Sequence, residues 1–234
     1  MEPISVTRTR SEVMVNDFVR SVYNWMCIGL ALTGFLAYFV STSPAMLQLV
    51  FGNPLVFYGL IIGELVMVFA LAGWVDRMSP STATALFVGY SGLNGITLSV
   101  IFLAYARASV VSTFFICSAT FAACSVYGWS TKKDLTSWGG FLTMGLIGIV
   151  IASVVNMFIH SNSMTMIISY IGVIVFVGLT AYDTQKIKVL ALSQPDGVDG
   201  SVTRRLAIHG ALTLYLDFIN LFLMLLRILG GRRE

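Results

Sequence analysis

Long apolar stretches, separated by short polar ones, run along almost the whole chain. Seven of them have about the length that a helix needs to cross a bilayer, roughly 20 residues. They cover residues 18–40, 54–74, 82–105, 110–129, 138–159, 164–183 and 206–229. Lipid cannot satisfy unpaired backbone groups, so only helices and closed barrels span it, and these stretches lack the period-two alternation of barrel strands. The pattern therefore predicts an all-α membrane protein with seven transmembrane helices.

Composition supports the same class and limits the number of domains. Hydrophobic residues make up 57% and charged residues 11% of the chain, against roughly 45–50% and about 25% in a typical soluble domain. A chain of 234 residues with seven spans has no room for a second globular domain. We expect a cytoplasmic N-terminal segment at 1–17, the transmembrane domain at 18–231 and a tail at 232–234. The first 16 residues show no apolar core with a cleavage site, so no cleaved signal peptide is expected.

The cysteines carry no recognisable chemistry. They number three, an odd count without metal-ligand or disulfide spacing, and all fall inside apolar stretches. We interpret them as small buried residues. They are Cys27, Cys117 and Cys124.

Lysine and arginine positions predict the orientation. With the N-terminus in the cytoplasm, most basic residues fall on the cytoplasmic side and Arg107 falls outside. The cytoplasmic set is Arg8, Arg10, Arg20, Arg77, Lys132, Lys133, Lys186, Lys188, Arg204 and Arg205. Arg227, Arg232 and Arg233 disagree, because seven crossings place them outside. Two alternatives stay open: a full crossing by the last segment, which we favour, or a segment that re-enters and returns. The basic residues form no patch with interleaved aromatics, which argues against a nucleic-acid partner.

Small residues recur at helical spacing in two spans. Gly89, Gly92 and Gly95 lie in the third span, and Gly145, Gly148 and Ala152 lie in the fifth. Such faces allow close helix contacts, and ordinary packing is enough to explain them. The connection at 193–201 is rich in turn residues, and we expect it to be exposed and mobile.

Three acids lie within or at the edge of the predicted spans: Glu64, Asp183 and Asp217. An ionised Asp at a helix centre costs about 2.5–3.5 kcal/mol on insertion scales, so it should face a partner, water or an ion. Asp217, near the middle of its span, is the most costly. Asp183 has an alternative interpretation as an interfacial residue, since Lys186 and Lys188 follow it.

A pairing of Asp183 with Asp217 meets one difficulty, because the acids differ in depth. Asp183 ends the sixth span, whereas Asp217 lies about three turns into the seventh. If the sixth helix extends past Asp183 towards Lys188, the two levels meet. Two carboxyl groups close together in low dielectric cannot both ionise cheaply, so such a pair tends to share a proton and can sense pH.

The last span carries a polar stripe that should face the protein interior or water. It consists of Gly210, Thr213, Asp217, Asn220, Met224 and Arg227. A shorter polar row in the third span could line the same space; it consists of Ser91, Asn94 and Thr97. A structural hydrogen-bond network is the alternative interpretation.

Calcium takes six to eight oxygen ligands, so two Asp side chains need further oxygens to complete a site. We predict a permeation or sensing site in which Asp183 and Asp217 bind calcium with low affinity. No tightly bound cofactor is expected. The supporting residues that these patterns predict are Glu64, Asn94, Thr213 and Asn220.

Two stretches resemble a known family: "YIGVIVFVGLTAYDTQKIK" at 170–188 and "GALTLYLDFINLFLMLLRILGG" at 210–231. They are similar to the sixth and seventh helices of the Bax inhibitor-1 family, and of its bacterial inner-membrane branch in particular. "NGITLSVIF" in the third span and "TKKDLTSWG" before the fifth extend the similarity. It covers nearly the whole chain after Asn16.

The resemblance implies a central seventh helix wrapped by the other six. It also implies a pH-sensitive calcium leak in the bacterial inner membrane, in which Asp183 pairs with Asp217. Some bacterial members have an arginine at the cytoplasmic end of the second helix that helps to lock the closed state. Arg77, in "GWVDRM" beside Asp76, is the nearest match, so the resemblance adds Arg77 to the predicted supporting residues.

Two other functions are weighed against the leak. Relatives in the bacterial branch are associated with a membrane-bound quality-control protease, so a regulatory partner is the first alternative. An intramembrane aspartyl protease is a remote one, since such enzymes also carry a Tyr-Asp pair. Their second Asp follows Gly-x-Gly, whereas Tyr215 and Leu216 precede Asp217 here and would keep a substrate strand away. We therefore predict no enzyme activity, and expect the lipid bilayer, calcium and protons as the partners.

Overall fold

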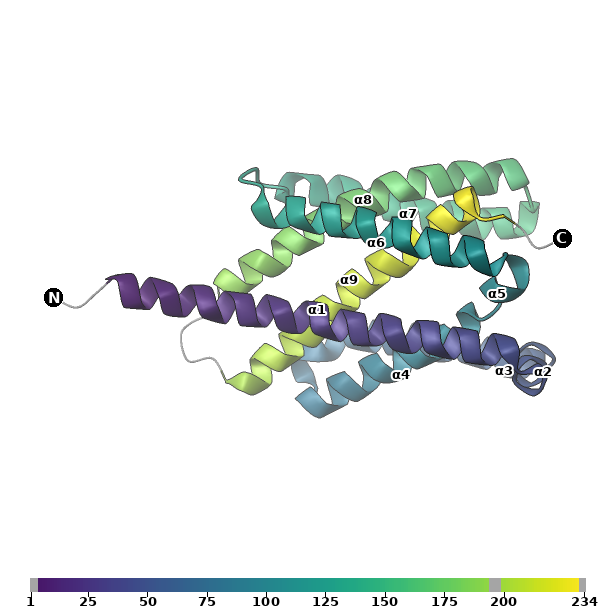
Figure 1. The fold of residues 1–234 in the computed structure, drawn as a ribbon, viewed down its shortest axis with the longest axis horizontal. Helices are drawn as coiled ribbons and strands as arrows, with labels where there is room; N and C mark the ends of the chain where they lie inside the picture. The colour runs from purple at the N-terminus through teal and green to yellow at the C-terminus, as the bar shows by residue number, and fades with distance from the viewer. Residues whose placement is uncertain (1–3, 194–198, 232–234) are drawn as a thin grey trace. The chain divides into compact units, whose positions relative to one another are not determined.

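The structure is a computed structural model that describes residues 4–193 and 199–231, with side chains from Met14 onward. In these ranges the chain is built from helices joined by short connections (Figure 1). The helices are α1 (Ile4–Thr42), α2 (Pro44–Phe51), α3 (Pro54–Trp74), η1 (Val75–Arg77), α4 (Pro80–Leu98), α5 (Ile101–Ala104), α6 (Arg107–Ser130), α7 (Thr136–Ile159), α8 (Asn162–Leu192) and α9 (Gly200–Leu229).

Seven helical segments in the described residues are long and apolar enough to cross a membrane, which confirms the predicted number of spans. The third span differs from the prediction, because it is interrupted between Leu98 and Ile101. Ser99 Oγ donates a hydrogen bond of 2.7 Å to the Ile96 carbonyl, and such back-bonding by serine bends helices. The short helix α2 lies where only a connection was expected. α8 runs to Leu192, so Asp183 lies well inside it.

Polar side chains mark where several helices begin. Asn53 Oδ1 accepts from the Leu55 amide, and Ser79 Oγ accepts from the Thr82 amide, each before a proline in the first turn. At the start of α9, Asp199 accepts hydrogen bonds from both the hydroxyl and the amide of Ser201. These bonds lower the pKa of Asp199. The connection at 193–201 lies mostly outside the described residues.

The chain divides into two compact units. The first comprises 1–104 and 190–215, and the second comprises 105–189 and 216–234, so the division falls within α9 and near the end of α8. In the first unit α1 and α3 pack on α4. The side chain of Tyr215, from α9, is completely buried in this unit, and its ring meets the edges of Phe87 and Tyr90.

Glycine allows close contacts at only some of the predicted positions. A Cβ on Gly95 would run into Thr33 of α1, and one on Gly145 would come within 2.9 Å of the Val175 side chain of α8. A Cβ on Gly148 would meet nothing within 4 Å, so the prediction of a packed face is wrong there. The closest approach in the second unit is one that the glycine pattern did not indicate, at Gly128 of α6 against the Ala181 backbone of α8.

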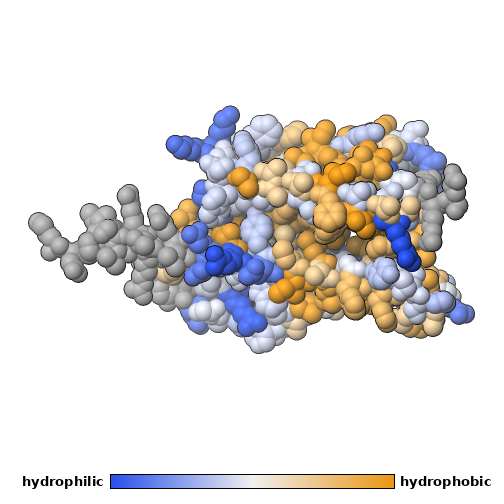
Figure 2. Space-filling view, viewed as in Figure 1, coloured by the Kyte–Doolittle hydropathy of each residue, from blue (hydrophilic) through white to orange (hydrophobic). Residues whose placement is uncertain are grey.

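Many large hydrophobic side chains are exposed, among them Phe35, Phe69 and Phe115, as lipid-facing side chains should be. In the view of Figure 2, orange, hydrophobic residues cover much of the face, and most of the blue, hydrophilic residues lie to either side of them. Cys27 is exposed, which corrects its predicted burial, whereas Cys117 is buried and Cys124 is half-buried.

Of the seven candidate spans, α9 has the largest share of buried residues, 56% of its most apolar stretch of 18 residues. Its place at the centre of the bundle stays a prediction, as do the domain boundaries at 1–17, 18–231 and 232–234. α9 is unbroken from Gly200 to Leu229, which favours a full crossing over a re-entrant segment.

Candidate functional site

Asp183 and Asp217 meet in the second unit, one from α8 and one from α9. Their side chains lie within hydrogen-bonding reach of each other. Both residues are buried, with 9% of Asp183 and 5% of Asp217 exposed. The difference in depth is removed because α8 continues past Asp183 to Leu192. The geometry therefore joins the two acids that the sequence singled out, whereas their function stays a prediction.

One oxygen of this pair is unsatisfied. Among the described residues, Asp217 Oδ2 is buried and has no hydrogen-bond partner. A buried acceptor without a donor is costly, and more so when it carries charge. A proton shared between the two carboxyl groups is one way to supply a donor.

Helix α6 packs against one side of α8 near Asp183. Gly128 lies against the backbone of Ala181, and the hydroxyl of Thr184 lies 3.4 Å from Ser125 Oγ. Glycine at 128 is what permits this approach, because a Cβ there would overlap the Ala181 carbonyl. α8 is thus fixed to α6 on both sides of Asp183 in the sequence.

Helix α7 and the α6–α7 connection pack against another side of α8. The Tyr182 ring covers Gly139 of α7. The side-chain amide of Gln185 donates to the Lys133 carbonyl and accepts from the Leu135 amide, each at 2.8 Å. These contacts fix the connection to α8 just beyond Asp183.

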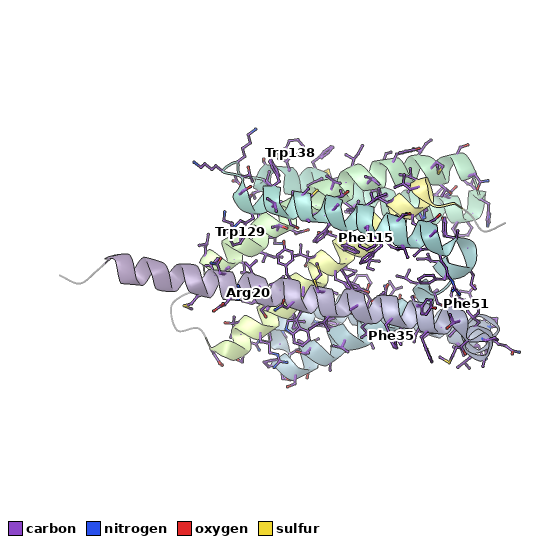
Figure 3. The ribbon with its side chains drawn as sticks, in the orientation of Figure 1. Arg20, Phe35, Phe51, Phe115, Trp129 and Trp138 are labelled. Carbon is purple, nitrogen blue, oxygen red and sulfur yellow. The ribbon has the colours of Figure 1, made fainter. Side chains whose placement is uncertain are left out.

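Lys188 completes the contact between α8 and the end of α6. Its Nζ donates a hydrogen bond of 2.6 Å to the Trp129 carbonyl and lies 5.2 Å from the centre of the Trp129 ring. Figure 3 labels Trp129 and Trp138, which lie at the same end of the second unit. Lys186, by contrast, is exposed, and its charge acts on the Asp183 carboxyl from the same helix.

The predicted supporting residues have partners of their own. In the first unit Glu64 is half-buried and accepts a hydrogen bond of 2.8 Å from Thr97. Asn94 is buried, with Nδ2 3.4 Å from the Tyr90 hydroxyl and with Oδ1 unpartnered among the described residues.

The remaining supporting residues are more local. Arg77 is exposed in η1. Thr213 donates to the His209 carbonyl, and Asn220 donates to the Leu216 carbonyl, so each side chain bonds to its own helix. Of the predicted set only Asn220 shares the second unit with the acid pair.

Metal binding by the pair would depend on additional ligands. Within 4–193 and 199–231, no group of three or more His, Cys, Asp or Glu side chains is gathered at one place. Two carboxyl groups with a few neutral oxygens suit a passing hard cation better than a tight calcium cage.

Sequence reasoning missed the residues that hold α8 in place. Ser125 and Gly128 are small residues inside a predicted span, and Gln185 follows an apolar stretch like an ordinary interfacial residue, so none of the three gave a distinct signal. For Lys188 the sequence indicated only a place on the cytoplasmic side. Their partners are set by tertiary packing.

Comparison with known proteins agrees with the family that the sequence resembles. The family model described as inhibitor of apoptosis-promoting Bax1 matches residues 15–234. The chain is 50% identical over 219 residues to inner membrane protein YbhL of Escherichia coli K12, covering 94% of this chain and 93% of that protein. It is 44% identical over 232 residues to an uncharacterized protein of Borreliella burgdorferi, covering 99% of each. A protein of Deinococcus radiodurans, also uncharacterized, is 42% identical over 234 residues, covering 100% of this chain and 98% of that one. The chain therefore belongs to the Bax inhibitor-1 family of membrane proteins.

Proposed function

We propose that this protein is a pH-sensitive calcium leak channel, gated by a proton that Asp183 and Asp217 share. The observation that carries the proposal is the meeting of two buried carboxyl groups, one of which has an oxygen without a donor. The name of the E. coli relative supports a place in the inner membrane. The lysine and arginine pattern supports a cytoplasmic N-terminus.

The shared proton gives the pair two states. With one proton, an O–H···O bond between the carboxyl groups holds α8 and α9 together. When that proton leaves, two negative charges repel each other in a medium of low dielectric, and a hard cation becomes a favourable partner. Calcium, with its preference for oxygen ligands, fits this role as a permeant ion. No step of this scheme requires covalent catalysis, so we propose a channel and not an enzyme.

The test is calcium entry into calcium-free liposomes that contain the purified protein and a fluorescent indicator. We expect flux down the gradient that rises from mildly acidic to neutral pH, by at most about tenfold per pH unit for one titrating proton. Asp183→Asn and Asp217→Asn should each abolish most of this pH dependence, because an amide neither shares the proton nor takes a charge.

Asp134→Asn is the matched control, because Asp134 is an exposed acid in the same unit. This variant should keep the wild-type pH profile. Unchanged profiles in both variants of the pair would reject the shared proton. Absence of flux from the wild type would reject the channel and favour a regulatory partner of a membrane protease.

A further inference from the structure

The polar contacts between α8 and the α6–α7 connection are not part of the proton-sharing pair. Gln185 bonds the connection twice, at Lys133 and Leu135, and Lys188 bonds the end of α6 at Trp129. We call the side chains of Gln185 and Lys188 the clasp. Each is half-buried, so the clasp lies at the boundary between the packed helices and their surroundings.

The clasp differs in kind from the other contacts of α8 near Asp183. Towards Asp183, α8 is fixed by Ala181 on Gly128 and by Tyr182 on Gly139, which are tight contacts of packed atoms. Beyond Asp183, the contacts of Gln185 and Lys188 are hydrogen bonds that water can replace.

Loss of the hydrogen bonds of Gln185 and Lys188 would increase the exposure of Asp183 in particular. Lys188 lies about 7.5 Å further along the axis of α8 than Asp183, at 1.5 Å per residue, and Gln185 lies between them. If the connection moves away from α8, the end of the helix that follows Asp183 loses its cover. Water and ions then reach a carboxyl group that is now 9% exposed.

We propose that Gln185 and Lys188 are positioning residues that hold the α6–α7 connection against α8 and so control the access of water and ions to Asp183. For ion passage this inference rests on the proposed channel. Control of access to the carboxyl group can be measured without any flux.

The experiment measures the labelling of Asp183 in protein reconstituted in liposomes. A water-soluble carbodiimide with an amine nucleophile modifies accessible carboxyl groups, and peptide mass spectrometry quantifies the product. We expect Gln185→Met and Lys188→Met to increase the labelling of Asp183 by about fivefold for each hydrogen bond lost. The exposed Asp199 serves as the internal reference.

Lys132→Met is the matched control, since Lys132 is an exposed lysine of the α6–α7 connection. It should leave the labelling within about twofold of the wild type, because surface charges contribute little to stability. Lys188→Arg keeps a donor and a cation over the Trp129 ring, and should restore near wild-type labelling. A merely structural role for Lys188 would not predict this rescue.

Hydrogen exchange at the Leu135 amide reports the clasp itself, because that amide donates to Gln185. Faster exchange at Leu135 with unchanged labelling of Asp183 would overturn the proposal. Gln185→Glu keeps the acceptor for Leu135 but loses the donor to Lys133, so it should show a smaller increase in labelling and keep the fold. Should the wild type pass no calcium, the channel fails, while the labelling results still decide whether the clasp controls access.

Discussion

A carboxyl group deep in a membrane helix persists where the protein gives it a partner, and Asp217 has Asp183. The cost of burial made these two residues recognisable in the sequence, because few other side chains are so unfavourable in lipid. The cost of burial does not identify uncharged polar residues that form hydrogen bonds in the folded protein, because such residues are common in membrane helices and at their ends. Gln185 and Thr97 each make a decisive hydrogen bond, yet neither differs from a solvent-facing or helix-packing residue until the fold is known.

At the same scale, Thr33 links three helices of the first unit. Its hydroxyl donates to the Ser91 carbonyl at 2.8 Å, so the Tyr215 hydroxyl, 2.7 Å away, must donate to Thr33. Thr33→Val therefore removes the acceptor of Tyr215 and the donor to Ser91 together, whereas Tyr215→Phe removes one bond and leaves no donor unpaired. We expect Thr33→Val to lower the free energy of unfolding by about 1–3 kcal/mol and Tyr215→Phe by about 1 kcal/mol or less.

Unfolding in mixed micelles with increasing detergent denaturant measures both values. The double variant should cost less than the sum of the two single variants, because both remove the same Thr33–Tyr215 bond. Equal costs for Thr33→Val and Tyr215→Phe would contradict the assignment of donor and acceptor.

At the scale of the helix, hydrophobic stretches located all seven spans but not their fine structure. At the break between α4 and α5 the Ser99 hydroxyl donates to the Ile96 carbonyl, but serine also occurs in unbroken membrane helices. α8 runs on to Leu192 because its last turns have tertiary partners, such as Trp129 for Lys188. Hydropathy measures transfer to lipid, so it cannot detect either cause.

The contact between α6 and α8 depends on a single missing side chain, at Gly128. A Cβ there would overlap the Ala181 carbonyl, which is backbone and cannot turn aside. We expect Gly128→Ala to lower the free energy of unfolding by about 1–3 kcal/mol, as overpacking usually does. It should also change the pH profile of flux, because Ala181 lies just before Asp183.

Gly148→Ala in α7 is the control, because a Cβ at that position meets nothing within 4 Å. It should be neutral or slightly stabilising, since alanine has the higher helix propensity. Unfolding in the same micelles compares the two variants, and equal stability would show that α6 and α8 can separate at no cost.

At the scale of the whole molecule, the number of crossings decides the side of the C-terminus. The basic residues before α9 predict a cytoplasmic N-terminus, whereas Arg227, Arg232 and Arg233 would prefer the cytoplasm too. α9, with 30 residues, is about 45 Å long, which exceeds a hydrocarbon core of about 30 Å. Its length therefore permits a full crossing against the charge bias.

The end of α9 gives a second reason to predict an external C-terminus. The Gly231 carbonyl accepts from the Ala106 amide, and the Gly231 amide donates to Ser109 Oγ, at the start of α6. α6 begins at Arg107, which the orientation places outside. A C-terminal alkaline phosphatase fusion should therefore be active, and a C-terminal green fluorescent protein fusion should be dark.

Substituting Arg227 by Ala should not change either result, because packing at Gly231 and not charge fixes this end. A fluorescent fusion would mean that the chain crosses an even number of times or in the opposite orientation, and an N-terminal fusion separates these two cases.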